Sequence, residues 1–242
     1  MNNNLCICDF HSHILPSIDD GAKDTSMAVT LLKEEIEQGV KHLCLTPHFY
    51  SNENVESFIK KRNLSFLKLK EQIYKENIKN VPDMHLGAEV ALNYATPEIP
   101  DLNKLCLGDT KLLLLEMPDT FWGDWIPEVL YRISAEKSLT PIIAHADRYI
   151  DNKNSIKILQ KLIDMDIIMQ FNSYNLTHPK VVGLIKKILA RNVNTPLIGS
   201  DAHNTKYRSV TIKKVSSPLH KILYGKNFIN NINTFTESIL IK

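Results

Sequence analysis

The sequence predicts an α/β fold built around a parallel sheet. Short apolar runs of strand length alternate with longer segments of helical pattern, which is typical of successive βα units. The chain has 242 residues, 43% apolar and 23% charged, and is long enough to bury a large core. The sequence contains no internal repeat, low-complexity tract or Gly/Ser/Pro-rich linker. We therefore expect residues 1–242 to form a single domain.

Seven short apolar runs are the candidate strands. They cover residues 5–10, 40–46, 84–90, 111–117, 141–145, 167–172 and 196–200. Seven strands with intervening helices fit either an open doubly wound sheet or a closed barrel. The hydrophobic period alone does not choose between the two.

Helical patterns separate these runs. They lie near residues 24–38, 54–79, 124–138, 154–165 and 178–193, with more helix after residue 208. Asp24 is a candidate N-cap for the first helix, and Gly39 lies just beyond its end. Pro127 falls in the first turn of the third predicted helix, 124–138, where a missing N–H costs little. The Lys-, Asn- and Glu-rich segment 51–80 predicts a long, partly solvated helix.

Charge and cysteine content exclude several classes of function. The formal net charge of +2 is too close to neutral for a protein that binds nucleic acid or anionic membranes. No apolar run approaches the roughly 18 residues of a membrane span, and the first residues lack a signal-peptide pattern, so we expect a cytoplasmic protein. No cysteine has an arginine six positions later, so the Cys-x5-Arg loop of cysteine phosphatases is absent from the sequence. The four cysteines are Cys6, Cys8, Cys44 and Cys106.

The clearest functional feature is a set of His, Asp and Glu side chains placed just past the apolar runs. Alternate residues of an extended chain point the same way, so His11 and His13 can converge on one ion, with Asp9 on the same side. The other runs are followed by His48, Glu89, Glu116, His145, Asp201 and His203. A hydrogen-bonded polar group at a strand end explains any one of them. Their repetition favours a metal centre, because the carboxyl ends of parallel strands share one rim.

Other polar residues are less clear. Asp20 lies in an Asp-Asp-Gly segment, which a turn explains as well as a metal ligand does. The remaining histidines lie within strands or beside helical patterns, and we expect them to be structural or exposed. They are His42, His85, His178 and His220.

Nine candidate ligands predict more than one ion, because a divalent ion takes roughly four to six ligands. Two or three ions with a bridging carboxylate would fit, and imidazole with carboxylate suits Mn, Fe or Zn, with Co or Mg as alternatives. The positive charge of three such ions would exceed the negative charge of the four carboxylates by about two. This surplus would attract a phosphate dianion, as in multi-metal phosphoryl hydrolases. Arg148 and Arg208 could clamp the phosphate, although surface ion pairs would explain them equally.

Six motifs run in order from residue 9 to residue 208: DFHSHILPSIDDGAKD, LTPHF, GAEV, LLLLEM, IAHADRY and GSDAHN. Together they resemble the PHP (polymerase and histidinol phosphatase) superfamily. Within it, they resemble the bacterial protein-tyrosine phosphatases of capsule and exopolysaccharide clusters, the CpsB/YwqE type. The resemblance implies a distorted (β/α)7 barrel with a trinuclear site, usually described with Mn, at the carboxyl ends of the strands.

The resemblance also implies roles for individual residues. The first ion would be held by His11, His13, Glu89 and Asp201. Glu89 would also hold the second ion, together with Glu116 and His145. The third ion would be held by Asp20, His48 and His203. Arg148 and Arg208 match the phosphate-contacting arginines of the family. The residues between His203 and Arg208 lack the Gly/Pro turn expected there, which leaves the direction of Arg208 open. Ala146-Asp147 replaces a larger residue and Glu, a conservative change.

The implied activity is hydrolysis of phosphotyrosine by a metal-activated hydroxide. The expected partner is a bacterial tyrosine kinase that controls capsule or exopolysaccharide synthesis. One alternative is another PHP activity, on histidinol phosphate, another small phosphomonoester or a phosphodiester. A second alternative is a catalytically silent protein that docks on a kinase, against which the full set of ligands argues.

Overall fold

The computed structural model describes residues 7–119, 121–225 and 227–240. The predicted strand 5–10 therefore begins outside the described residues, and Cys6 lies outside them. Seven parallel sheet segments follow one another along the chain, and two of them are interrupted. They are β1 (Cys8–Ser12), β2 with β3 (His42–Leu45, His48–Phe49), β4 with β5 (Asp83–Leu86, Glu89–Ala91), β6 (Leu112–Glu116), β7 (Thr140–Ile143), β8 (Ile168–Asn172) and β9 (Leu197–Gly199).

The two interruptions lie side by side in the sheet. Pro47, which has no N–H to donate, separates β2 from β3. Gly87 separates β4 from β5, and a side chain there would collide with Leu107, since an added Cβ would lie 2.6 Å from Leu107 Cδ2. The ladder continues across both interruptions, because Gly87 N donates to Leu45 O and Glu89 N to Pro47 O, at 2.9 and 3.0 Å. The two broken segments therefore behave as single curved strands.

The sheet curls so that its first and last strands meet at their carboxyl ends. All described neighbours pair in parallel and in chain order, from β1 round to β9. His13 N donates to Ala202 O at 2.9 Å, and Asp201 N donates to His11 O at 2.8 Å. This confirms the expected distorted seven-stranded barrel and decides against an open doubly wound sheet.

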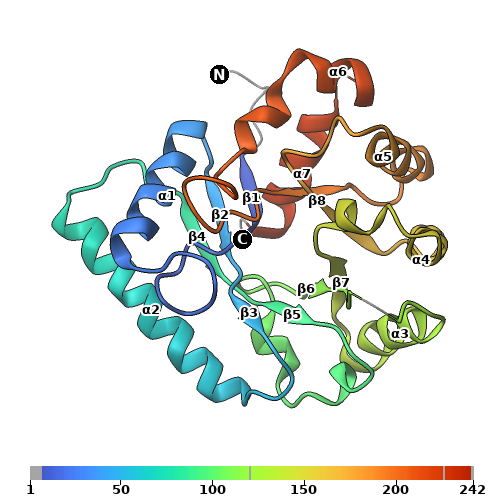
Figure 1. Ribbon diagram of the computed structural model, residues 1–242, viewed down its shortest axis with the longest axis horizontal. Helices are drawn as coiled ribbons and strands as arrows, with labels where there is room; N and C mark the ends of the chain where they lie inside the picture. Colours follow the sequence, from blue (N-terminus) through green and yellow to red (C-terminus); the bar gives the residue numbers. More distant parts are fainter. Residues whose placement is uncertain (1–6, 120, 226, 241–242) are drawn as a thin grey trace.

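In the described part of the chain, seven α-helices surround the sheet (Figure 1). They are α1 (Thr25–Gln38), α2 (Val55–Lys75), α3 (Trp125–Lys137), α4 (Lys153–Asp164), α5 (Pro179–Arg191), α6 (Pro218–Tyr224) and α7 (Phe228–Leu240). The predicted caps of α1 are confirmed: Asp24 accepts a hydrogen bond from Met27 N at 2.8 Å, and Gly39 ends the helix with φ 85°. None of the helices in the described part of the chain is both long and apolar enough to cross a membrane.

Short 3-10 helices occupy four connections: η1 (Thr96–Glu98), η2 (Leu102–Leu105), η3 (Ala146–Tyr149) and η4 (Ile212–Ser216). Between β5 and β6 the chain forms η1 and η2 in place of an α-helix. Pro97 and Pro100 explain this difference, because each removes a backbone donor that a longer helix would need.

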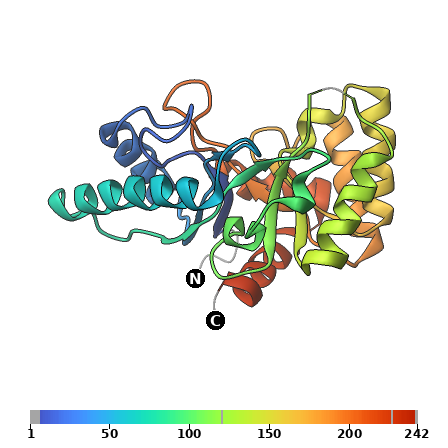
Figure 2. The ribbon, with the colours of Figure 1, turned by 90° about the horizontal axis from the view of Figure 1, so that it is seen from below.

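The inside of the curled sheet is an apolar core that α7 covers at one end. Alternate strand residues such as Phe10, Leu114 and Ile142 point inward, and Phe235 of α7 packs against them. Figure 2 shows α7 at the end of the sheet where both chain termini lie. Because this end is covered, polar groups gather at the opposite, carboxyl end of the strands.

Candidate metal centre

Glu89 lies at the middle of the carboxyl rim, surrounded by histidines. Its Oε2 lies 3.2 Å from the Nε2 atoms of both His11 and His13. The same oxygen lies 3.1 Å from His48 Nδ1, and Glu89 Oε1 lies 2.8 Å from His145 Nε2. Burial alone would raise the pKa of Glu89, but the surrounding imidazoles hold it well below its usual value. Three strand ends, those of β1, β3 and β7, thus bring four histidines to one carboxylate.

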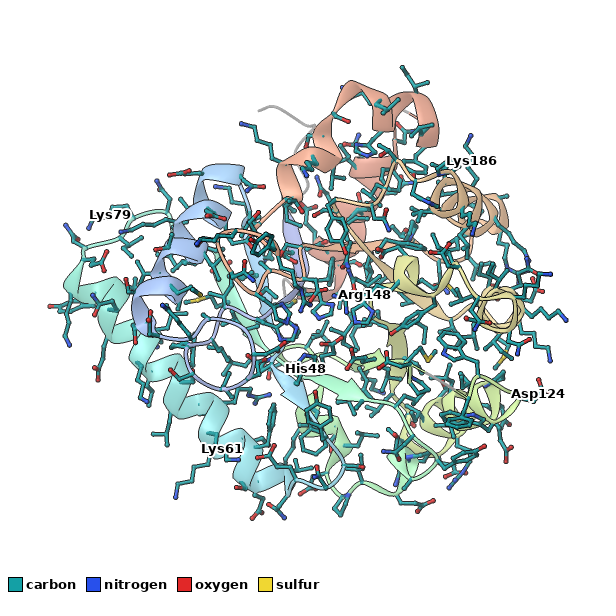
Figure 3. The ribbon with its side chains drawn as sticks, in the orientation of Figure 1. His48, Lys61, Lys79, Asp124, Arg148 and Lys186 are labelled. Carbon is teal, nitrogen blue, oxygen red and sulfur yellow. The ribbon has the colours of Figure 1, made fainter. Side chains whose placement is uncertain are left out.

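Glu116 and Asp20 lie on either side of His48. Glu116 Oε2 lies 3.7 Å from His48 Nδ1, and Glu116 Oε1 lies 3.6 Å from His145 Nε2. Asp20 Oδ1 lies 3.4 Å from His48 Nε2 and 3.3 Å from His203 Nε2. In Figure 3 the labelled His48 and Arg148 lie near the middle of the ring of strands, whereas the labelled Lys61 and Lys186 lie on its outside.

The fourth carboxylate, Asp201, lies deeper in the site beside the two β1-derived histidines. Its Oδ1 lies 3.7 Å from the Nε2 atoms of His11 and His13, and 3.5 Å from His203 Nδ1. All nine ligand candidates therefore lie at this rim. Asp201 is almost completely buried, so its charge must be balanced within the site.

Three groups of these side chains have ligand atoms within 4.8 Å of one another. They are His13, Asp20, His48 and His203; His11, His13 and Glu89; and His48, Glu89 and Glu116. Several of the atoms involved are buried and have no hydrogen-bond partner, namely His48 Nδ1, Glu89 Oε2, His145 Nδ1 and His203 Nε2. Buried polar atoms are normally paired, so His48 Nδ1, Glu89 Oε2 and His203 Nε2, which face one another or Asp20 across the centre, are available to bind a cation. Imidazole nitrogens and carboxylate oxygens together fit divalent transition-metal ions.

Two arginines converge on Asp201 from different loops. Arg148, in η3, donates through Nη2 to Asp201 Oδ2, and Arg208 donates through Nη2 to Asp201 Oδ1 at 2.6 Å. Each arginine side chain is about a third exposed, so each also faces solvent. The two guanidinium groups therefore lie at the mouth of the site, where an incoming anion would meet them.

The loop before Arg208 forms its turn without Gly or Pro. Asn204 Oδ1 accepts hydrogen bonds from Lys206 N and Tyr207 N, at 3.0 and 2.9 Å. His203 N donates to Arg208 O at 2.8 Å and closes the loop. The Asn204 side chain thus replaces the expected turn residues. It directs Arg208 into the site.

Two further residues orient the histidines, and the sequence predictions did not include them. His13 Nδ1 donates to Asp19 Oδ2 at 2.7 Å, and His11 Nδ1 donates to Gln170 Oε1 at 3.0 Å. These bonds leave the Nε2 atoms of both rings directed at the centre. Asp19 is adjacent to Asp20 in the sequence, and Gln170 is a polar residue inside an apolar strand. Either signal could have identified them.

Asp9 and Asp147 are buried acids that stabilise the loops around the centre. Asp9 Oδ1 accepts from His11 N and Ser200 N, at 3.0 and 2.9 Å, and thereby joins β1 to the end of β9. Asp147 accepts from Asn172 N at 2.7 Å and Asn175 Nδ2 at 3.1 Å. Burial raises the pKa of both carboxyl groups. Both side chains are held by protein donors.

The other four histidines lie outside these groups. His42 Nδ1 lies 3.3 Å from His85 Nε2, at the far end of the strands. His220 Nδ1 lies 2.8 Å from Ser217 Oγ, and His178 precedes α5. Their positions agree with the expectation of structural or exposed roles.

Comparison with known proteins gives a consistent set of relatives. A family model described as capsular polysaccharide synthesis, CpsB/CapC, matches residues 7–241. The tyrosine-protein phosphatase YwqE of Bacillus subtilis (strain 168) is 30% identical over 222 residues, which cover 88% of this chain and 84% of the relative. The tyrosine-protein phosphatase CpsB of Streptococcus pneumoniae is 29% identical over 210 residues, which cover 81% and 82%.

Solved structures show the same fold. One belongs to a study of YwqE from Bacillus subtilis and CpsB from Streptococcus pneumoniae, described as unique metal-dependent tyrosine phosphatases. It matches with a TM-score of 0.78 and 23% identity, over 96% of this chain and 94% of that one. A histidinol phosphate phosphatase from Lactococcus lactis, complexed with Zn, L-histidinol and phosphate, matches with a TM-score of 0.54 and 14% identity, over 92% and 94%.

Proposed function

This chain belongs to the CpsB/CapC family of capsular polysaccharide synthesis proteins, and we propose that it is a metal-dependent phosphatase that hydrolyses phosphotyrosine in proteins. The observation that carries the proposal is the convergence of four histidines on the buried Glu89, beneath two arginines. This arrangement combines a cation-binding cluster with two phosphate-binding side chains. The relatives that are named tyrosine-protein phosphatases support the choice of substrate.

We assign the nine rim residues as ligands of three divalent ions, with Mn as the preferred metal. The sets follow the family resemblance: His11, His13, Glu89 and Asp201; Glu89, Glu116 and His145; and Asp20, His48 and His203. The ligand-atom groups of the structure differ from them in placing His48 with Glu89 and Glu116 and in including neither His145 nor Asp201. The unpaired buried atoms of Glu89, His48 and His203 support this assignment. Bound divalent cations would lower the pKa of a water and neutralise the charge on phosphate oxygens.

The chain's own residues bind and orient the substrate in this proposal. Arg148 and Arg208 donate parallel hydrogen bonds to the phosphoryl oxygens and stabilise the charge that develops on them. Asp19 and Gln170 hold the imidazoles of His13 and His11 in fixed orientations. Asp147 is already held by Asn172 and Asn175, and a phenol with a pKa of about 10 can leave without a dedicated carboxylic acid.

The proposed partner is a phosphotyrosine-bearing protein, specifically a bacterial tyrosine kinase of capsule or exopolysaccharide synthesis. Its support is the capsular role in the family description. The open rim also suits a protein substrate, because Arg148 and Arg208 are accessible at the surface.

The test is hydrolysis of a phosphotyrosine peptide by the purified protein, before and after chelation. Mn, Fe, Zn, Co and Mg are then added back singly. We expect turnover to be lost on chelation and restored most strongly by Mn. Histidinol phosphate and single-stranded DNA serve as comparison substrates.

Turnover that survives complete removal of metal would contradict the mechanism. Faster turnover of histidinol phosphate would replace the proposed substrate with the main alternative. Absence of all turnover with three ions bound would favour the silent docking protein.

A further inference from the structure

A tyrosine lies beside the candidate metal centre and has no role in the ligand assignment. Tyr50 follows β3 directly, and its side chain is 52% exposed. Its ring is stacked against the imidazole of His48, with 5.8 Å between ring centroids and 25° between planes. One ring face thus lies toward the centre, while much of the side chain stays open to solvent.

The phenol of Tyr50 is close enough to the centre to experience its charges. It interacts electrostatically with the carboxylates of Glu116, Asp20 and Glu89, which come from three different strand ends. These residues surround the position proposed for the phosphoryl group. A ligand held there by Arg148 and Arg208 would extend its organic part toward the edge of the site, where Tyr50 lies.

Two other tyrosines near this rim, Tyr149 and Tyr174, have their hydroxyl groups engaged within the protein. Tyr149 donates to Met117 O at 3.3 Å and accepts from Met117 N at 3.2 Å. Tyr174 OH accepts from Asn172 Nδ2 at 3.3 Å. Within the described residues, the hydroxyl of Tyr50 makes no hydrogen bond to the protein. Tyr50 thus combines a ring stacked on a ligand candidate with a hydroxyl that stays available to a ligand.

The loop that carries Tyr50 is held in place before any ligand binds. Glu53 N donates to Tyr50 O at 2.9 Å and closes a turn. Asn93 Nδ2 donates to Ser51 Oγ at 2.8 Å and ties this loop to the one that follows β5. A fixed aromatic ring loses little conformational freedom on binding, so its contact with a ligand contributes more fully to affinity.

We propose that Tyr50 contacts the aromatic ring of the substrate and makes the site selective for aryl over alkyl phosphates. The inference rests on the proposed phosphatase function and adds a specificity residue to it. Offset or edge-to-face aromatic pairs form at centroid separations of about 4.5–7 Å. Their contribution corresponds to a preference of about threefold to tenfold in affinity.

The test compares two non-hydrolysable ligands on the metal-loaded, full-length protein. Phenylphosphonate and methylphosphonate share the anionic head and differ in the ring, and calorimetry gives both dissociation constants. We expect the wild type to bind phenylphosphonate more tightly. Tyr50→Ala should weaken phenylphosphonate about threefold to tenfold and leave methylphosphonate unchanged. Tyr50→Phe should retain the preference, because it keeps the ring.

Tyr131→Ala is the matched control. Tyr131 is 65% exposed and lies on α3, which is on the outside of the ring of strands (Figure 1), so its removal should change neither constant. Equal weakening of both phosphonates by Tyr50→Ala would show that Tyr50 only supports His48, and would overturn the inference. Unchanged binding of both would also overturn it.

Failure of the phosphatase proposal gives a different result. If the protein does not hydrolyse phosphotyrosine peptide but still prefers phenylphosphonate in a Tyr50-dependent manner, the ring contact stands and the catalytic proposal falls. If neither phosphonate binds the metal-loaded protein, both proposals fall.

Discussion

The second sheet segment carries a histidine at each end, and the third carries His85 at its amino end and Glu89 toward its carboxyl end, but only the carboxyl ends form a ligand cluster. At that end His48 meets Glu89, whose side chain is 1% exposed. At the amino end His42 and His85 lie 3.3 Å apart, and the carboxylate beside His42 is Asp83, 4.0 Å away and 82% exposed. The two sites differ in buried negative charge. Proximity of imidazoles alone does not create a cation site.

The pKa values of the rim histidines His13 and His145 follow the same difference, whereas burial and the neighbouring His13 lower the pKa of His203 to about 3. Burial would lower the pKa of His13, but Asp19 and Glu89 raise it to about 10. His145 is likewise raised to about 9 by Glu116 and Glu89. At the amino end, burial lowers the pKa of both His42 and His85, and the nearby acids do not reverse the shift. Negative charge therefore dominates around His13 and His145, whereas desolvation dominates at the amino end.

Removing the central charge of the rim should have the largest effect. In Glu89→Gln the carboxylate that we propose to bridge two ions becomes a neutral amide that binds divalent ions poorly. We expect loss of bound metal and a fall of more than about 100-fold in kcat/KM for phosphotyrosine peptide, since even residues that only orient ligands cost about 10–100-fold. The measurements are metal content by mass spectrometry and peptide turnover.

The same type of change at the amino end is the control. His85→Gln alters a histidine of the same sheet segment and should keep both metal content and turnover within about twofold of wild type, because it lies outside the centre. A Glu89→Gln protein that retains its full metal content would remove Glu89 from the ligand set.

The two ends can also be compared through carboxylates that contact a histidine without being proposed as metal ligands, and here we expect a smaller effect. Asp19 accepts from His13 Nδ1, so Asp19→Asn should weaken metal affinity by about 10–100-fold while the ligands themselves remain. The matched variant is Asp83→Asn, which changes the exposed acid beside His42 and should have no effect on metal affinity. Titration of metal into chelated protein measures both. Equal affinity in the two variants would show that the Asp19 contact does not position His13.

Local sequence pattern was sufficient to predict the strands, the helices and the rim residues that follow the strands, whereas it left Asp20 open, and the family resemblance supplied that residue. Alternation placed His11 and His13 on one side of β1, and parallel strands bring their carboxyl ends together whatever the details of closure. The contacts between distant residues could not be predicted in this way. Gln170 meets His11 across 159 residues only because β8 and β1 lie in one curled sheet. The sequence also did not reveal that both arginines would converge on Asp201, because that depends on the loop shaped by Asn204.

The smallest expected effect concerns the amino-end histidines and the pH dependence of stability. Burial lowers the folded-state pKa of His42 and His85, while the unfolded chain titrates near 6.5. Below that pH the unfolded state binds more protons, so stability falls as the pH decreases through 6.5 toward the folded values. His85→Gln removes one of these groups and the repulsion it exerts on its neighbour. The variant should therefore lose less stability than wild type between pH 7.5 and 5.5.

Urea denaturation of the metal-free proteins at both pH values measures this difference. We expect it to be below about 1 kcal/mol, smaller than a typical core substitution. The rim histidines act in the opposite direction: the raised pKa of His13 and His145 adds stability that is fully present below 6.5 and is lost as the pH rises toward 10 and 9. That contribution is common to both proteins and cancels in the comparison. An identical loss of stability in the two proteins would mean that His85 is as easily protonated in the folded chain as in the unfolded one, and the electrostatic contrast between the two ends would then rest on the rim alone.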